Sequence, residues 1–228
     1  MSHPWECDYR AHPNSRRISI TYKGNKRFVV TYPRRVSRRH AEAFVQSRME
    51  WMETVVNTPE PTVQSLASHL RNHPLVTIMN RQVPVRWTLL YPEIDFDSLS
   101  SIDQFPIFDN GERSLVRQLS ALASATLPSQ VRALSSRLPI PAVRGVSIRN
   151  QRSRWGSCSS SGNVSLNWRL VLMPPDLQNH IILHELAHLV HMNHSPAFWD
   201  LLASWDPQSE TNQKSLKRLG KDWIRLAQ

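Results

Sequence analysis

Residues 181–199, with the sequence IILHELAHLVHMNHSPAFW, organise the rest of this chain and contain the pattern HExxH at residues 184–188. An α-helix advances about 100° and 1.5 Å per residue, so His184 and His188 would lie one turn apart on one face. Both imidazoles can then reach one ion, and Glu185 lies on the flank of that face. Its carboxylate would hold and deprotonate a water molecule, the general-base role that this pattern has in metallohydrolases. The pattern therefore predicts a zinc site.

A catalytic zinc ion has three protein ligands and an open position for water, so a third ligand must follow the helix. In a continued helix, His191 would lie about 10.5 Å along the axis from His184, too far for three histidines to share one ion. A helix break is predicted at Met192-Asn193, since Asn tolerates the conformation that ends helices, and the chain can then fold His194 back. The spacing HExxHxxxxxH is that of the metzincins, with His191 in place of their turn glycine. We therefore predict three metal ligands, His184, His188 and His194, and one catalytic base, Glu185.

Two non-catalytic interpretations compete with this one. An ordinary core helix with incidental histidines would bury a carboxylate and two imidazoles without partners, which is costly. A structural zinc site usually has four protein ligands, whereas this stretch offers three histidines and Glu185. Both are less favoured than a catalytic site.

Composition places the chain among intracellular proteins. Its 228 residues suffice for one domain with a small accessory lobe and a buried core. The two cysteines, Cys7 and Cys158, match neither a C-x-x-C pair nor a disulfide framework. The N-terminus lacks the apolar core of a signal peptide, and no stretch approaches the roughly 18 apolar residues of a membrane span. We predict a cytoplasmic protein without membrane association.

The net charge of +10 is concentrated near the N-terminus, where residues 1–50 have 11 Lys and Arg against 4 Asp and Glu. Such a face either keeps the protein soluble or attracts nucleic acid, a nucleotide or another polyanion. Neither a glycine-rich phosphate loop nor a paired-cysteine finger accompanies the charge. The basic residues considered for this face are Arg16, Arg17, Lys23, Lys26, Arg27, Arg34, Arg35, Arg38 and Arg39.

The first half of the chain predicts small α and β elements. Alternating apolar and polar residues at 17–22 and 27–32 flank a Gly24-Asn25 turn, a pattern typical of a β-hairpin. Ser37 is the predicted N-cap of a helix that runs to about Val56. A second hairpin is predicted over residues 75–90. The acidic, Ser-rich residues 91–112 predict a loop that links an N-terminal lobe to the catalytic part.

The second half predicts the elements around the metal. A helix is expected at 113–127, and a second segment begins at Pro128. Two strands joined at residues 160–162 are expected next, and the second alternates apolar and polar residues up to Leu170. It leads directly into the HExxH helix, which places a sheet edge beside the metal. That edge either binds an extended peptide by strand addition or only supports the helix. Two further helices, at about 198–205 and 211–226, are predicted to pack against the site.

Several motifs together resemble the YgjP-like metallopeptidase family, which is related to the SprT-like and WLM zincins. The residues that carry the resemblance are 152–158 (RSRWGSC), Gly162, 167–170 (NWRL), 184–188 (HELAH), 193–195 (NHS), Phe198 and Trp199. The match is dense from about residue 127 to 199 and looser in the N-terminal hairpin and helix. The resemblance implies a zincin-like catalytic fold and a zinc ion held by His184, His188 and His194, with Glu185 as base.

These observations lead to one leading prediction. The chain is expected to have an α+β fold, with an N-terminal β-hairpin and helix lobe at 1–112 and a zincin-like domain at 113–228. We predict a zinc-dependent peptidase that acts on a peptide or protein, with His191, Arg154 or Arg169 as a second stabiliser of the reaction's oxyanion. Two alternatives are a nucleoside triphosphate pyrophosphatase and a nucleic-acid-associated SprT-like protease.

Overall fold

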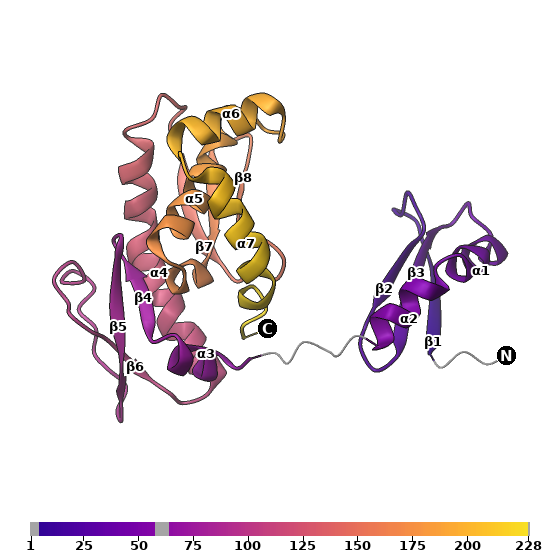
Figure 1. Ribbon diagram of the computed structural model, residues 1–228, viewed down its shortest axis with the longest axis horizontal. Helices are drawn as coiled ribbons and strands as arrows, with labels where there is room; N and C mark the ends of the chain where they lie inside the picture. Colours follow the sequence, from indigo (N-terminus) through magenta and orange to yellow (C-terminus); the bar gives the residue numbers. More distant parts are fainter. Residues whose placement is uncertain (1–4, 58–63, 228) are drawn as a thin grey trace. The chain divides into compact units, whose positions relative to one another are not determined.

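The computed structural model of the protein describes residues 5–57 and 64–227, and Figure 1 shows the arrangement of its elements. The chain divides into two compact units, an N-terminal unit of residues 1–62 and a C-terminal unit of residues 63–228. This boundary lies 50 residues before the one predicted from the sequence. The difference arises because residues 64–112 pack with the second half of the chain, as described below. None of the described helices is both long and apolar enough to cross a membrane.

The N-terminal unit is a three-stranded sheet with two helices. Its central strand, β3, pairs in parallel with β1 and antiparallel with β2. Its elements are β1 (Glu6–His12), β2 (Ser19–Tyr22), β3 (Arg27–Pro33), α1 (Arg38–Gln46) and α2 (Met49–Asn57). The predicted hairpin is confirmed: Gly24, Asn25 and Lys26 all have positive φ in its turn. Strand β1 was not predicted, because only its pairing with β3 distinguishes it from a polar terminus.

The predicted first helix is two helices. The hydroxyl of Ser37 accepts a hydrogen bond from the backbone N–H of His40 at 3.3 Å, which confirms Ser37 as the N-cap of α1. The helix ends at Gln46, and α2 begins three residues later. The Ser47 hydroxyl donates to the carbonyl of Phe44 at 2.8 Å and occupies one of the carbonyl groups that a helix end leaves free.

The C-terminal unit contains two further three-stranded sheets, packed with five α-helices. In the first sheet β5 pairs antiparallel with β4 and in parallel with β6, and in the second β9 pairs in parallel with β7 and antiparallel with β8. Figure 1 shows α4 running past both sheets. The elements are α3 (Leu66–Asn72), β4 (Leu75–Ile78), β5 (Arg81–Thr88), β6 (Phe105–Phe108), α4 (Glu112–Ser135), β7 (Gly145–Arg149), β8 (Gly156–Cys158), β9 (Asn163–Asn167), η1 (Trp168–Leu172), α5 (Pro175–Ala187), α6 (Pro196–Trp205) and α7 (Ser209–Trp223).

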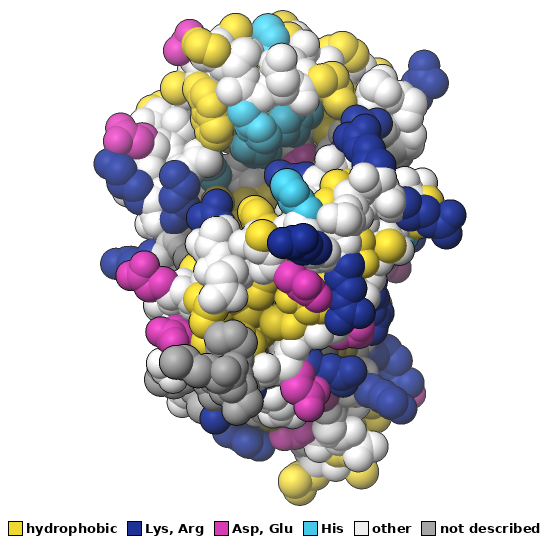
Figure 2. All heavy atoms as spheres, turned by 90° about the vertical axis from the view of Figure 1, so that its right-hand side faces the viewer, with side chains coloured by type: hydrophobic (Ala, Val, Ile, Leu, Met, Phe, Trp, Pro, Cys, Tyr) yellow, Lys and Arg dark blue, Asp and Glu magenta, His cyan; other side chains and the backbone are white. Residues whose placement is uncertain are grey.

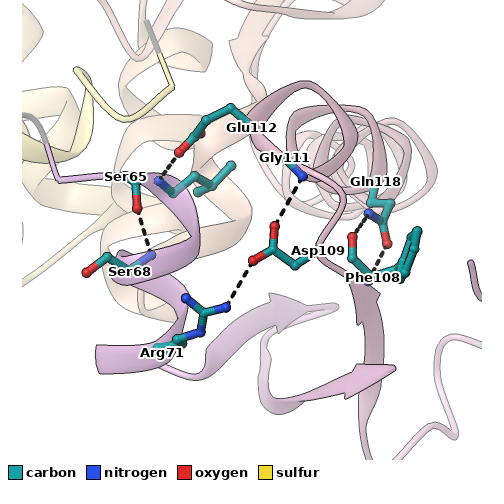
Figure 3. A network of polar contacts seen from close by, with 9 residues as sticks. Ser65, Ser68, Arg71, Phe108, Asp109, Gly111, Glu112 and Gln118 are labelled. Carbon is teal, nitrogen blue, oxygen red and sulfur yellow. Dashed lines mark hydrogen bonds and ion pairs between the residues drawn. The ribbon is translucent and has the colours of Figure 1, made fainter. Parts of the chain in front are cut away.

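The prediction that residues 91–112 form a linking loop is wrong at its C-terminal end. Strand β6 pairs with β5, and the buried amide of Gln118 both donates to the carbonyl of Phe108 at 2.7 Å and accepts from its N–H at 2.9 Å. The Glu112 carboxylate accepts from the N–H of Leu66 at 2.7 Å (Figure 3). These bonds tie α3, β6 and α4 together. The acidic residues before the strand conceal it, since only four residues pair.

Helix α4 is one helix of 24 residues, although a break was predicted at Pro128. Proline removes one backbone hydrogen bond in a helix interior, at a cost of about 3 kcal/mol. Leu127 and Val131, on either side of Pro128, are fully buried. Burying such side chains contributes about 1.5–3 kcal/mol each, which offsets the lost bond.

The strand that was predicted to run to Leu170 ends earlier. Strand β9 stops at Asn167, whose side-chain oxygen accepts from the N–H of Arg169 at 3.1 Å and caps the 3-10 turn η1. All five residues of η1 are buried. Arg169 donates to the carbonyl of Leu226 at 2.8 Å and to the side-chain oxygen of Asn150 at 2.8 Å. Arg169 thus fixes the end of the chain, and burial lowers its pKa to about 10.

Candidate metal centre

Helix α5 presents the HExxH residues because its other faces are buried. It begins with Pro175 in its first turn, a favoured position for proline, and its residues Ile182 and Leu186 are fully buried in the core. The helix ends at Ala187, five residues before the predicted break at Met192. The N–H of His191 still bonds to the carbonyl of Ala187 at 2.9 Å, so the chain turns tightly just after His188.

The predicted ligand histidines converge. Ring nitrogens of His184, His188 and His194 all lie within 4.8 Å of one another. Nε2 of His194 is 3.0 Å from Nε2 of His184. His194 lies just before Ser195 and Pro196, the first residue of α6, so the helix predicted at about 198–205 begins two residues earlier. No side-chain hydrogen bond from Ser195 caps the helix.

Two aromatic residues of α6 support the three imidazoles. Phe198 is fully buried, and its ring centroid lies 4.9, 4.7 and 4.8 Å from those of His184, His188 and His194. Trp199 stacks on His194 with centroids 5.5 Å apart and an interplanar angle of 24°. The sequence analysis predicted only that the helix at about 198–205 packs against the site. In the structure they hold all three histidine rings in place.

His191 contributes through its backbone and not through its ring. Its carbonyl oxygen lies 3.0 Å from Nδ1 of His188 and accepts a hydrogen bond when that nitrogen is protonated. This bond leaves Nε2 of His188 with its lone pair, as a metal ligand requires, and such outer bonds usually orient metal-binding histidines. The His191 ring is not part of the three-histidine cluster.

The electrostatics of the cluster favour the neutral imidazoles of His184 and His188. Burial, together with the neighbouring histidines His188, His194 and His180, lowers the pKa of His184 to about 3. Burial also lowers the pKa of His188, opposed by the hydrogen bond to His191 and assisted by His194. A neutral imidazole offers the lone pair that a metal ion needs.

The donor set fits a zinc ion. Zinc prefers imidazole nitrogens at about 2.0–2.1 Å in tetrahedral geometry, which places ligand nitrogens about 3.3 Å apart. The Nε2 atoms of His184 and His194 lie 3.0 Å apart, which is close to that separation, and all three ligand nitrogens lie within 4.8 Å of one another. Magnesium and calcium instead prefer oxygen ligands, and three imidazoles offer none.

Glu185 lies beside the cluster, against the edge strand β8. It is 6% exposed, and burial raises the pKa of its carboxyl group to about 8, an effect that Arg154 opposes. A Cβ atom at Gly156 would lie only 2.6 Å from Cγ and Oε1 of Glu185. Only glycine therefore allows this approach. A sheet edge does contact α5, but the edge strand is β8, whereas the strand predicted to supply it, β9, lies between β7 and β8.

A cavity of about 320 Å³ opens next to the histidines, and Figure 2 shows histidine side chains gathered beside a hollow in the upper part of the view. Two elements besides α5 supply its walls, the segment before β8 and helix α7. It is lined by Arg154, Trp155, Gly156, His180, Ile181, His184, Glu185, Gln213, Leu216 and Lys217. Of the three residues considered as oxyanion stabilisers, Arg154 alone lines it. Arg169 is buried elsewhere, as described above.

Comparison with known proteins assigns the family. The model of the YgjP-like metallopeptidase domain matches residues 16–219, most of the chain. The chain belongs to the YgjP-like metallopeptidase family. This membership makes it a metal-dependent peptidase in broad terms, and a divalent metal and a peptide or protein substrate follow from it.

Other comparisons add little to the family assignment. Comparison with curated proteins gives no match. One solved structure, the crystal structure of the metallopeptidase zymogen of Pyrococcus abyssi abylysin, is 21% identical and aligns over 46% of this chain and 96% of its own, with a TM-score of 0.32. An alignment that loose places no residue of this YgjP-like chain.

The sequence analysis missed a buried group of polar side chains at the wall of the cavity of this YgjP-like protein. His180, one helical turn before His184, is 2% exposed, and its Nδ1 lies 2.6 Å from Oδ2 of Asp206. Asn212 donates to the same oxygen at 3.1 Å. These contacts join α5 to the residues between α6 and α7. The spacing of His180, His184 and His188 is visible in the sequence. Asp206, the carboxylate partner of His180, lies 26 residues further along the chain, so that spacing does not reveal it.

The close approach of Gly156 to Glu185 leads to a test of the site's geometry. Gly156→Ala is expected to lower peptidase activity about a hundredfold without loss of metal, because the new methyl group must displace the Glu185 carboxylate, and a shift of about 1 Å can cost that much. Steady-state kinetics and metal analysis of the purified variant provide the measurement.

Gly145→Ala is the matched control. Its Cβ would meet the flexible side-chain oxygen of Asn163 at 2.9 Å, in a strand that does not line the cavity. Comparable activity loss in both variants would contradict a specific role for Gly156.

Proposed function

We propose that this protein is a zinc peptidase in which His184, His188 and His194 hold the ion and Glu185 is the general base. The observation that carries the proposal is the convergence of three imidazole nitrogens within 4.8 Å beside a buried carboxylate that lines a cavity. No group among residues 5–57 and 64–227 donates a hydrogen bond to that carboxylate. Its oxygens are therefore available to a water molecule.

The proposed reaction is hydrolysis of a peptide bond. A bound zinc ion would polarise the scissile carbonyl and lower the pKa of water at the site. Glu185 accepts one proton from the attacking water, whose oxygen forms the new bond to the carbonyl carbon. The C–N bond then breaks, and Glu185 delivers the proton to the leaving amine. The charge of Arg154, which lines the same cavity, stabilises the negative oxygen.

The edge strand offers a place for the substrate backbone. Among the described strands, β8 pairs with β9 alone, so its other side presents backbone groups next to Glu185. An extended peptide that pairs there would gain main-chain hydrogen bonds while its scissile bond approaches the histidines. This arrangement supports a peptide substrate over a nucleotide.

The other predicted partners have less support. In the N-terminal unit, Arg16, Arg34 and Arg35 line a depression of about 610 Å³, whereas Arg38 is paired with Glu42 at 3.0 Å. This positive surface is compatible with a polyanion, but Mg²⁺-dependent triphosphate hydrolysis uses carboxylate oxygens as metal ligands, whereas the cluster offers three imidazoles. Nucleotide hydrolysis and association with nucleic acid stay predictions, as does the cytoplasmic location.

Removal and return of the metal tests the proposal. We expect a chelator to abolish cleavage of a peptide mixture and zinc to restore it, whereas magnesium should not, because three imidazoles suit zinc. Mass spectrometry of the peptides after incubation measures the cleavage, with a nucleoside triphosphate assayed in parallel. Zinc-loaded protein that cleaves no peptide but hydrolyses the triphosphate would overturn the proposal.

A further inference from the structure

Helix α7 supplies a lysine to the wall of the cavity, and this lysine has no function in the reaction proposed above. Lys217 lines the cavity together with Gln213, which lies one helical turn before it. Trp155, Ile181 and Leu216 supply the apolar part of the same lining. An apolar pocket with a few polar groups is the usual form of a specificity site.

The charge of Lys217 is not compensated by its own helix. Lys214, three residues earlier, forms an ion pair with Glu210 at 2.7 Å. Lys217 has glutamine four residues before it and lysine four residues after it, so helical spacing offers it no carboxylate. Among residues 5–57 and 64–227, no carboxylate lies within ion-pair distance of Lys217.

The rest of the cavity shares this excess of positive charge. Among the described residues of the lining, Arg154 is a second cation and Glu185 is the only acidic residue. Glu185 is committed to the proton transfers of the proposed reaction. Because Arg154 is assigned above to the negative oxygen of the reaction, a substrate group that enters the cavity meets one uncommitted cation, Lys217, and the amide of Gln213, a pair that favours a carboxylate.

We propose that the cavity beside the metal centre binds a carboxylate of the peptide substrate, with Lys217 as the residue that determines this specificity. The inference rests on the proposed peptidase function and adds the substrate class. The carboxylate comes from an aspartate or glutamate side chain or from a free C-terminus. The two sources share their chemistry, and the experiment distinguishes them.

Binding is tested first, without turnover. Four peptides of one sequence carry either glutamate or glutamine at one internal position and either a free or an amidated C-terminus, with the sequence taken from a site that the wild type cleaves. Titration calorimetry with zinc-loaded Glu185→Gln protein measures each dissociation constant. We expect the preferred carboxylate to bind about five- to tenfold more tightly than its amide, a ratio that falls in 1 M salt.

Two neutral variants of α7 provide the matched comparison. Lys217→Met and Lys214→Met each remove one positive charge and keep the aliphatic stem. We expect Lys217→Met to reduce the preference to less than about twofold and Lys214→Met to leave it unchanged, because Lys214 does not line the cavity. Lys217→Glu should make the amide peptides the better ligands.

Cleavage by the wild type separates the two proposals. If zinc-loaded wild type cleaves the acidic and amide peptides with equal kcat/KM and the binding constants are also equal, the carboxylate specificity is wrong and the peptidase function stands. If Lys217→Met and Lys214→Met lose the preference for the carboxylate peptide equally, the carboxylate specificity is also wrong. If no peptide from a broad mixture is cleaved, the peptidase function itself is wrong.

Discussion

Replacement of Glu185 by glutamine is expected to reduce peptide hydrolysis at least about a hundredfold while zinc stays bound, since general-base catalysis typically contributes 10²–10⁴-fold. Glutamine has nearly the shape of glutamate, so the packing against Gly156 is kept. Its amide cannot accept the proton of water. Steady-state kinetics with a cleaved peptide and metal analysis of the same sample measure the two properties.

The matched control is Glu210→Gln. Glu210 is exposed on α7 and forms an ion pair with Lys214, so this change also replaces a carboxyl group by an amide but should leave the activity unaltered. Activity of the Glu185→Gln protein within a few-fold of wild type would show that another group accepts the proton. Loss of zinc from that variant would instead give Glu185 a role in metal binding.

Local spacing predicted the convergence of the three histidines because helix geometry is local. His184, Glu185 and His188 depend only on the rotation of about 100° per residue, and the three-histidine cluster is found where the spacing placed it. The end of α5 was misplaced by five residues. That error did not affect the cluster, since His194 returns to it from a short turn.

Contacts between distant segments could not be predicted from spacing. Gly156 lies 29 residues before Glu185. Its neighbours in the sequence are typical of a turn or a strand, and they do not reveal that the Glu185 carboxylate packs against its Cα. Arg169 was a candidate stabiliser of the oxyanion, yet it is buried and donates to the carbonyl of Leu226. The pairing of β6 with β5 likewise depends on a partner elsewhere in the chain.

His194 is the third predicted ligand, and its loss should strongly weaken zinc binding. His194→Ala is expected to remove most of the zinc, because loss of a direct ligand costs more than the 10–100-fold in affinity associated with outer-shell residues. His191→Ala should retain about one zinc per chain, since the group that contacts His188 is the backbone carbonyl of residue 191, which alanine keeps. Metal analysis after dialysis against a weak chelator measures both variants.

Thermal unfolding gives an independent readout of the same site. A ligand present at 1,000 times its dissociation constant stabilises the folded state by about 4 kcal/mol, so zinc should raise the melting temperature of the wild type and of His191→Ala but not of His194→Ala. The His194→Ala protein should still fold, because Phe198 of α6 is buried without an ion and packs against Leu183 and Ala187 of α5. Zinc retention by His194→Ala together with zinc loss from His191→Ala would assign the third ligand to His191 and require the turn after Ala187 to rearrange.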